Sequence, residues 1–338
     1  MKQKDGQAFV KECMRTRVVA APVSGVELTH DDGVLMLGSC FTDEIGSRLE
    51  NGLFGVIHNP FGEMYNPLSV ADALERILDR RGFSEDDLVM DASGVWHCWW
   101  LHSSFSSVDP EKVLDAGNSA LSRASAIMDC KRPPVIMLTF GSAYCYRHKD
   151  LGVTVANCHK FPQSTFDCVR IGPDEIIRRW DNLLDKFYSL YPSAKIIFTV
   201  SPVRYLSYGP HGNTVSKAVL HLAVEELCRR DNVYYFPAFE IVTDDLRDYR
   251  FYADDMVHPS KMAADYVYDS LLSWLCNDET LSLAAECAAL KRRFMHRPLV
   301  DNPKAYSTFL RQSYAEVDRL IESRPCLECR RDVFFKKK

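Results

Sequence analysis

The sequence has no long hydrophobic run and no excess of basic charge. No stretch approaches the roughly 20 apolar residues of a membrane-spanning helix, and residues 1–20 lack the apolar segment of a secretory signal peptide. The net charge of −5 and the pI near 6.1 leave no electrostatic footprint for nucleic acid. We therefore expect a cytoplasmic protein without a membrane or nucleic-acid partner.

Internal repeats and low-complexity linkers are also missing. With 338 residues, 46% of them hydrophobic, the chain has enough apolar surface for one elaborated domain or two. Without an export signal, the twelve cysteines are expected to be mostly reduced thiols. Cys326 and Cys329 form half of a zinc-ribbon or redox motif, but no second pair accompanies them. We expect neither a metal nor a cofactor.

What the sequence does contain is a regular alternation of strands and helices. Apolar strand patterns occur at 34–37, 55–58, 135–139, 195–200 and 233–236. Helical patterns lie at 67–79, 110–129, 173–191, 217–230 and 261–275. This alternation predicts a three-layer α/β/α fold with a mostly parallel sheet. We expect a domain over 15–276 and a helical C-terminal extension over 277–338, frayed from Phe334 onward.

Two segments interrupt the alternation. Residues 89–107 predict a hairpin insertion rich in aromatic side chains, which forms either one wall of a pocket or a cap over the core. Within it His97, Cys98 and His102 are of metal-ligating types, but they lack an acidic partner at a regular spacing, so an aromatic wall is favoured. Residues 150–172 are expected to form a long irregular loop, a kind of segment that is often functional.

The sequence around Cys40 has the pattern of a nucleophile turn. Residues 38–46 read GSCFTDEIG and stand between the first apolar strand and a helix that carries Ile45 and Leu49. The free amides and the dipole at a helix N-terminus favour a thiolate, or an oxyanion formed beside it. The alternative is a strand-to-helix turn in which Gly38 serves geometry and Cys40 packs as a small hydrophobe.

A second motif lies near the end of the alternating region. Asp255 and His258 stand three residues apart, and Pro259 disfavours helix at His258, so the ring is free to project from a loop. In a nucleophile site the histidine takes the proton and a carboxylate orients its ring. Since active sites of such folds lie at the carboxyl ends of the strands, we expect Cys40, Gly62, Gly141 and His258 at one edge of the sheet.

The combination of these motifs resembles the SGNH, or GDSL, hydrolase-like superfamily, and within it the GSCFA family. Gly38 to Phe41 spell the first four letters of that family's motif, with Thr42 in the fifth place. Further segments similar to the family are NPFGEMYNP at 59–67, HSSFS at 102–106, TFGS at 139–142, NCHK at 157–160, SPVR at 201–204 and DLRDYRF at 245–251. The resemblance covers roughly residues 15–275 and implies the SGNH-like fold.

The resemblance also implies roles for individual residues. Placed on the superfamily pattern, Cys40 rather than Ser39 is the nucleophile, His258 is the general base and acid, and Asp255 orients it. Gly62 or Asn66 is implied as an oxyanion donor. The third-block position, Gly141-Ser142-Ala143, lacks the usual Asn, so Ser142 or Asn157 would substitute. His102, His159 and Arg204 are candidates for substrate binding, the last two for an anionic group.

Two functions remain open from the sequence. The first is an acyl-transfer enzyme that attacks an ester or thioester of a small molecule or glycan through a Cys (or Ser)-His-Asp triad. Water as acceptor makes it an esterase, and a sugar or amine makes it an acyltransferase. The second is a catalytically inactive SGNH-fold binding protein. The altered first and third blocks favour inactivity, whereas the intact Asp255–His258 pair favours catalysis.

Overall fold

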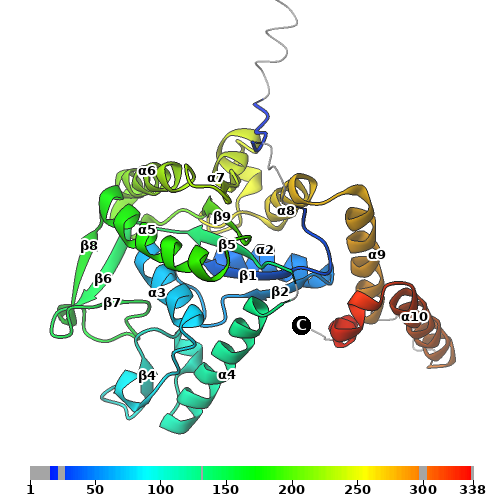
Figure 1. Cartoon of the computed structure of the whole chain (residues 1–338), viewed down its shortest axis with the longest axis horizontal. Helices are drawn as coiled ribbons and strands as arrows, with labels where there is room; N and C mark the ends of the chain where they lie inside the picture. Colours follow the sequence, from blue (N-terminus) through cyan, green and yellow to red (C-terminus); the bar gives the residue numbers. More distant parts are fainter. Residues whose placement is uncertain (1–15, 22–26, 131, 297–302, 336–338) are drawn as a thin grey trace, which may run out of the picture.

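A computed structural model describes residues 16–21, 27–130, 132–296 and 303–335. Its central sheet has five parallel strands in the order β10-β9-β5-β1-β2. Their bounds are β1 Gly33–Gly38, β2 Gly55–His58, β5 Val135–Phe140, β9 Lys195–Val200 and β10 Val233–Tyr235. β1 is entirely buried, as is β5, because both of their faces are covered. The predicted α/β architecture is therefore confirmed (Figure 1).

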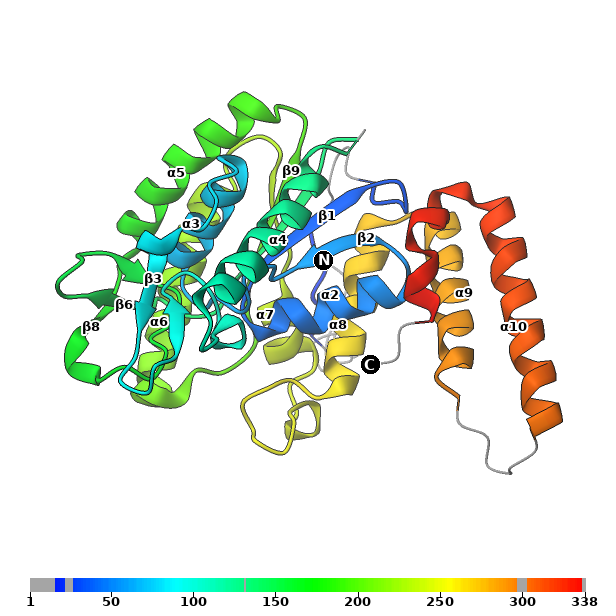
Figure 2. The same ribbon diagram turned by 90° about the horizontal axis from the view of Figure 1, so that it is seen from below.

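Helices cover both faces of this sheet, which gives three layers (Figures 1 and 2). Alternate strand residues separate into two apolar cores. Leu35 and Leu138 pack with one set of helices, and Met36 and Met137 pack with the other. The first set is α3 Pro67–Leu78, α4 Pro110–Met128, α5 Pro173–Leu190 and α6 Gly209–Leu227; the second is α2 Cys40–Asn51, the short α7 Ala238–Glu240 and α8 Lys261–Leu275.

The strand order fixes where a site can form. β1 lies between β2 and β5, so the chain moves to one side of β1 first and then to the other. Neighbouring strands end at the same edge of the sheet. Gly38 of β1 is paired with Thr139 of β5, and Thr139 is paired with Thr199 of β9. In open sheets of this kind ligands bind at the carboxyl edge where the order reverses. Here that place is the edge between β1 and β5.

The predicted hairpin insertion is present, whereas the prediction of a long irregular loop over residues 150–172 is wrong. β3 Leu88–Met90 pairs antiparallel with β4 Trp96–Cys98. Residues expected to be irregular instead contribute to a three-stranded antiparallel sheet of β6 Tyr144–His148, β7 Thr154–Val155 and β8 Phe166–Arg170. The strands were missed because β8 is largely exposed and β7 has only two residues, so neither gives an apolar run.

The C-terminal region is helical, and its end is packed. α9 Asp278–Phe294 and α10 Pro303–Ser323 are followed by a 3-10 helix, η7, at Pro325–Phe334. They share an apolar core with Leu53, which lies just after α2. Phe334 is fully buried in that core, so the expectation of a frayed end at this residue is wrong, whereas residues 336–338 lie outside the described ones. Figure 2 shows these helices beyond the β2 edge of the sheet.

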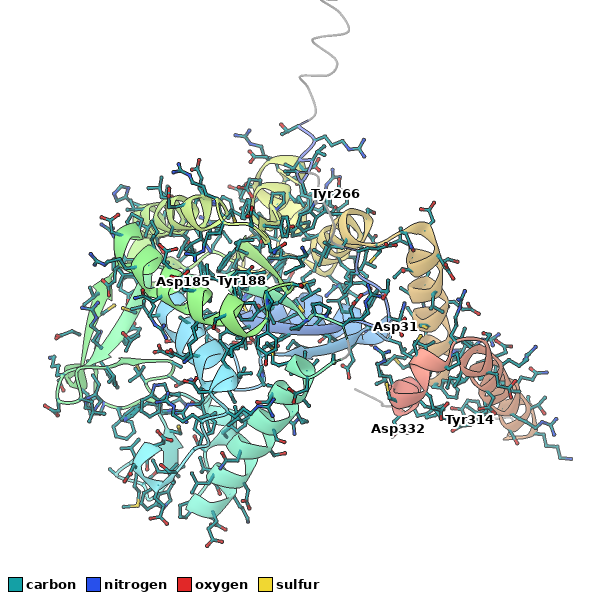
Figure 3. The ribbon with its side chains drawn as sticks, in the orientation of Figure 1. Asp31, Asp185, Tyr188, Tyr266, Tyr314 and Asp332 are labelled. Carbon is teal, nitrogen blue, oxygen red and sulfur yellow. The ribbon has the colours of Figure 1, made fainter. Side chains whose placement is uncertain are left out.

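Side-chain bonds fasten outer helices to neighbouring segments of the chain. Tyr266 of α8 donates to a carboxylate oxygen of Asp245, 3.0 Å away. Tyr188 of α5 donates to the carbonyl of Asn232, and Asp185 of the same helix pairs with Arg230. Figure 3 labels Tyr188 and Asp185 on α5, and Tyr266 on α8. The cysteines in the described ranges are free thiols.

Candidate active site

The turn after β1 places Cys40 at the first residue of α2. Gly38 has φ +149°, and a side chain there would collide with the carbonyl of Thr139. Asn59 holds the turn, because its amide oxygen accepts the Gly38 N–H at 2.9 Å. Cys40 therefore stands at a helix N-terminus beside the carboxyl edge of β1 and β5, as the sequence pattern predicts.

Ser39 and Cys40 differ in accessibility. The Ser39 side chain is 1% exposed, and its hydroxyl is buried without a hydrogen-bond partner. Its Cβ faces the third-block loop, only 3.2 Å from where a Cβ on Gly141 would be. Cys40 is half-buried and lines a cleft. A nucleophile must contact substrate, so this difference in exposure favours Cys40 over Ser39.

His258 and Asp255 form a bonded pair. His258 Nδ1 lies 2.7 Å from Asp255 Oδ2, while Asp255 Oδ1 accepts the backbone N–H groups of Val257 and His258 at 2.8 and 3.0 Å. These bonds lower the pKa of Asp255 to about 2, and the bond from the backbone N–H of His258 makes the largest contribution. The carboxylate is therefore charged near neutral pH and orients the imidazole. The two side chains are 48% and 50% exposed.

A cleft of about 960 Å³ brings Cys40 and His258 together. It lies among α2, the loop that carries Glu63, the segment 253–259, α8 and α9. Of the four residues expected at one edge of the sheet, Cys40 and His258 line this cleft, whereas Gly62 and Gly141 are not among its described lining residues. α9 contributes Ala288, Lys291 and Arg292 to the lining, and Met295 follows the helix directly, so residues from the C-terminal extension form part of the wall.

Electrostatics at Cys40 run against the expected thiolate. Burial, followed by the negative charges of Glu63 and Asp43, raises the pKa of the thiol to about 11. The backbone N–H groups of Phe41 and Cys40 at the helix start oppose this shift. The sequence prediction weighed the helix terminus but not the desolvation, and desolvation prevails. Cys40 is therefore a thiol near neutral pH, and attack needs a base.

Several charged side chains of the cleft form bonds with neighbouring groups. Arg48 bonds Glu44 at 2.7 Å and Asp265 at 2.8 Å. Asp43 bonds His58 Nδ1 at 2.7 Å. Glu63, close to Cys40, accepts a bond from the Tyr65 hydroxyl at 2.6 Å. Glu63 was not selected from the sequence, although it lies within the 59–67 motif.

Three groups implied as oxyanion donors bond elsewhere in this structure. The Gly62 N–H donates to the Asn59 carbonyl at 2.8 Å. The Asn66 side chain caps α3 by accepting the Ser69 N–H and donating to the Ser69 hydroxyl, both at 2.9 Å. The Ser142 N–H donates to the Tyr65 carbonyl, and its hydroxyl, 2% exposed, accepts the Tyr144 N–H. The donors associated with the Cys40 sulfur are instead the N–H groups of Phe41 and Cys40.

The residues proposed for substrate binding on the hairpin and the long segment form a packed network. His159 Nε2 bonds the Cys98 carbonyl at 2.8 Å, and Asn157 Oδ1 accepts the His159 N–H at 2.8 Å. Burial lowers the pKa of His159 to about 4, so the ring is neutral near pH 7. His102 packs against Gly62. Among the described residues that line the Cys40 cleft, none of these side chains occurs.

The aromatic hairpin caps the core instead of forming a wall of this cleft. Trp99 is buried in a cluster with Val155 and Phe166, and Trp100 packs against the main core. Arg204 lies closer to the site, since its N–H donates to the carbonyl of Val257 at 3.1 Å. That bond connects the end of β9 to the segment with His258. Substrate contacts of Arg204 stay a prediction.

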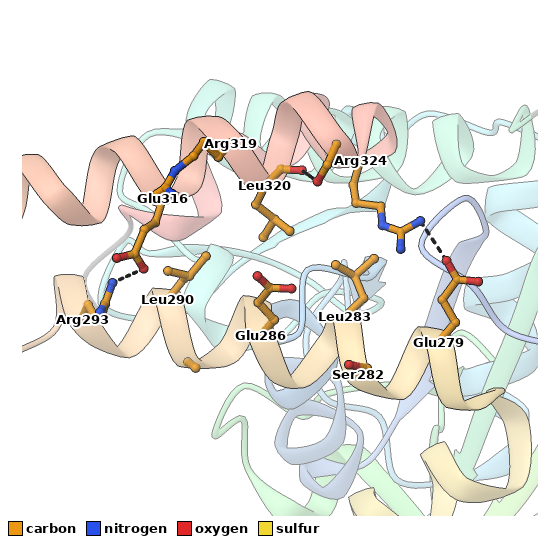
Figure 4. A pocket seen from close by; sticks show the side chains of 12 residues that line it. Glu279, Ser282, Leu283, Glu286, Leu290, Arg293, Glu316, Arg319, Leu320 and Arg324 are labelled. Atoms are coloured by element: carbon orange, nitrogen blue, oxygen red, sulfur yellow. Dashed lines mark hydrogen bonds and ion pairs between the residues drawn. The ribbon is translucent and has the colours of Figure 1, made fainter.

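A second cavity, of about 870 Å³, lies between α9 and α10 (Figure 4). Arg324 pairs with Glu279 at 2.8 Å, and Arg293 pairs with Glu316. In Figure 4 these ion pairs join the two helices at opposite ends of the cavity.

Over the described part of the chain, no helix is long and apolar enough to cross a membrane. The same residues contain no cluster of three or more His, Cys, Asp or Glu arranged to hold a metal ion.

Comparison with known proteins gives one family match. The model of the GSCFA family matches residues 33–271, and no curated protein sequence matches the chain. Among solved structures, a carbohydrate esterase family 3 protein from Talaromyces cellulolyticus aligns with 9% identity and a TM-score of 0.35, over 75% of this chain and 99% of that one. An acetyl xylan esterase from the rumen bacterium Butyrivibrio proteoclasticus aligns with 12% identity and a TM-score of 0.37, over 78% and 66%.

Proposed function

Because this chain belongs to the GSCFA family, and because one cleft brings together its Cys40 and a carboxylate-bound histidine, we propose that it is a cysteine-dependent acyl-transfer enzyme. The shared cleft is the observation that supports this proposal most directly. The substrate class is an ester or thioester of a small molecule or glycan. Transfer to water would make the protein an esterase, and transfer to a sugar or amine would make it an acyltransferase.

In the proposed reaction His258 removes the thiol proton as the Cys40 sulfur attacks the acyl carbonyl carbon. Asp255 holds Nδ1–H, so Nε2 is the nitrogen that accepts this proton. The backbone N–H groups at the start of α2 stabilise the developing negative charge. The tetrahedral intermediate collapses to a thioester on Cys40, and the leaving alcohol or thiol takes the proton from His258. Water, or another acceptor deprotonated by His258, then attacks this thioester, and His258 returns the proton to the Cys40 sulfur as it leaves.

The raised pKa of Cys40 makes the base essential to this mechanism. At pH 7 a thiol with a pKa of about 11 is almost entirely protonated. Proton removal must therefore accompany attack, which is the role that the Asp255–His258 pair supports. The same raised pKa, together with the engaged donors of Gly62 and Asn66, is the observation that favours the second candidate function, a binding protein with an inactive site.

The experiment is intact-mass measurement of the full chain after incubation with a panel of acyl esters and thioesters, followed by peptide mapping. The expected result is one acyl adduct on Cys40, which Cys40→Ala abolishes and Ser39→Ala preserves. Cys158→Ala is the matched control, because Cys158 is also half-buried and burial also raises its pKa to about 11. An adduct that persists in Cys40→Ala and disappears in Ser39→Ala would show that Ser39 is the nucleophile. Absence of any adduct and any turnover would favour the binding protein.

A further inference from the structure

Lys217 of α6 is a buried cation that the proposed mechanism does not use. Its side chain lies on the buried stripe of the helix with Leu220, Val224 and Leu227, and the residue is 3% exposed. The Nζ atom donates to the carbonyl of Gly141 at 2.7 Å and to that of Ser201 at 2.6 Å. These two residues directly follow β5 and β9, so Lys217 joins the carboxyl ends of two adjacent strands.

Burying an ammonium group is costly, typically several kcal/mol, unless nearby groups compensate. Two carbonyl oxygens satisfy two of the three donors of Lys217. Burial lowers the pKa of Lys217 to about 7, and negative charge on Cys40 acts in the opposite direction. Near neutral pH both forms of the amine are therefore populated, and charge on the sulfur shifts the balance towards ammonium.

The bonded loop connects Lys217 to the nucleophile turn. Gly141 packs against Ser39, the residue before Cys40, and its N–H donates to the Tyr65 carbonyl at 2.8 Å. The neighbouring Ser216 holds the same loop without charge, since its hydroxyl accepts the Ala143 N–H at 2.8 Å. The loop occupies the third-block position, where the superfamily pattern has an Asn and this chain does not.

Other ionisable groups also act on this pair. The carboxylates of Glu63 and Asp43 oppose a thiolate at Cys40, and His258 lines the same cleft. On the Lys217 side, His221 lies one turn further along α6 and approaches Glu240 at 3.7 Å. Burial lowers the pKa of His221, and the positive charge of Lys217 acts in the same direction. Near the sulfur, Lys217 is thus a positive counterweight to two carboxylates.

We propose that Lys217 is a positioning residue for Cys40, whose ammonium holds the Gly141 loop against the nucleophile turn and stabilises the negative charge that develops on the sulfur. The proton stays on Nζ, and His258 carries the proton that the thiol loses. This inference rests on Cys40 being the nucleophile of the proposed function, and it adds a charge that the Cys-His-Asp triad does not supply.

The first test is the pH dependence of Cys40 alkylation by iodoacetamide in the full chain, followed by peptide mass spectrometry. Lys217→Gln keeps a donor but loses the charge, and Lys217→Met loses both. At pH 6, where the Lys217 ammonium is populated, we expect both variants to be alkylated about tenfold more slowly than the unmodified sequence, whereas above pH 9, where the amine is neutral, the rates should be alike. Ser216→Ala, which loosens the same loop without changing charge, should leave the rate at pH 6 in place. An unchanged rate at pH 6 in a folded Lys217→Gln protein would overturn the proposal.

A second measurement leaves Lys217 in place, so it does not depend on how the variants fold. Iodoacetate puts a carboxylate on Cys40, whereas iodoacetamide puts a neutral amide of similar size there. The Lys217 side-chain carbon signals, followed by NMR across a pH titration, should give a pKa about one unit higher in the carboxymethylated protein. Equal values would contradict the proposal. If the pKa differs but no acyl adduct ever forms on Cys40, the proposed function fails while the Lys217–Cys40 coupling stands.

Discussion

Two histidine–carboxylate pairs of this protein have the same chemistry and opposite surroundings. His97 is 7% exposed, with Nδ1 bonded to the Ser106 hydroxyl at 2.7 Å and Nε2 bonded to Asp91 at 3.1 Å. His258 is about half exposed, with Nδ1 bonded to Asp255 at 2.7 Å. Among the described residues, no hydrogen-bond partner occupies its Nε2, and the residue lines the Cys40 cleft.

The comparison shows that availability, not residue type, distinguishes a candidate catalytic histidine. An imidazole with both nitrogens bonded inside the fold is fixed and contributes to stability. An imidazole held at one nitrogen by a carboxylate has the other free for a proton. Both histidines stood out in the sequence, and only the tertiary contacts separate them. Changes at the two pairs should therefore affect different quantities. Changes at the His258 pair should lower turnover, and changes at the His97 pair should lower stability.

The largest expected effect is on turnover. Asp255→Asn should lower kcat/KM for an acyl ester by about 10³- to 10⁴-fold, because the amide cannot stabilise the imidazolium and favours the wrong tautomer. Asp91→Asn, the matched change in the other pair, should alter kcat/KM by less than about threefold, because Asp91 is not among the described residues that line the cleft. Initial-rate kinetics on purified variants measure both. Similar losses in the two variants would show that the pairs are not functionally distinct.

The second effect is on the free energy of unfolding. His97→Ala removes a buried ring that packs at a tilt against His159, at a centroid distance of 4.6 Å, and leaves the Ser106 hydroxyl without its bond. We expect a loss of about 2–4 kcal/mol, from the cavity and the lost hydrogen bonds. His258→Ala, at a half-exposed position, should cost less than about 1 kcal/mol. Urea unfolding followed by circular dichroism compares the two. A larger loss for His258→Ala would invert the comparison.

The third effect is a pH dependence of the free energy of unfolding that originates in His159, the ring packed against His97. The pKa of His159 is lowered to about 4 in the folded protein, whereas it is about 6.5 when unfolded. The unfolded chain therefore binds the extra proton first, so stability is full above pH 6.5 and falls as the pH drops towards 4. The loss from this residue should reach about 2–3 kcal/mol. His159→Gln should flatten the profile between these pH values, as measured by urea unfolding at each pH.

The smallest effect concerns the wall that α9 contributes to the cleft. Ala288→Trp should narrow the cleft and lower kcat/KM for a bulky acyl ester about tenfold, while an acetyl ester loses less than about twofold. Ala285→Trp is the matched control, because Ala285 is exposed on the same helix and is not part of the described lining. Equal losses of kcat/KM for the bulky and acetyl esters, or equal losses in both variants, would show that α9 does not select the substrate.

The sequence alone determined the elements whose signal is local. β1 and β5 are apolar runs that any fold of this class must bury, and the glycine turn into α2 follows from the residues that flank Cys40. The Asp255–His258 pair also forms within one short segment, so three-residue spacing was enough to predict it. The C-terminal helices were visible as periodicity, although their contribution to the cleft was not.

Only the tertiary structure decided the properties that depend on neighbours distant in sequence. The pKa of Cys40 is raised by burial and by Glu63, 23 residues away, which outweigh the favourable helix start. Gly62 and Asn66 bond within their own loop instead of presenting free donors. Lys217 continues the buried stripe of α6, but its acceptors belong to the ends of β5 and β9. Desolvation and hydrogen-bond saturation are set by what packs around a group, and a linear pattern does not contain that information.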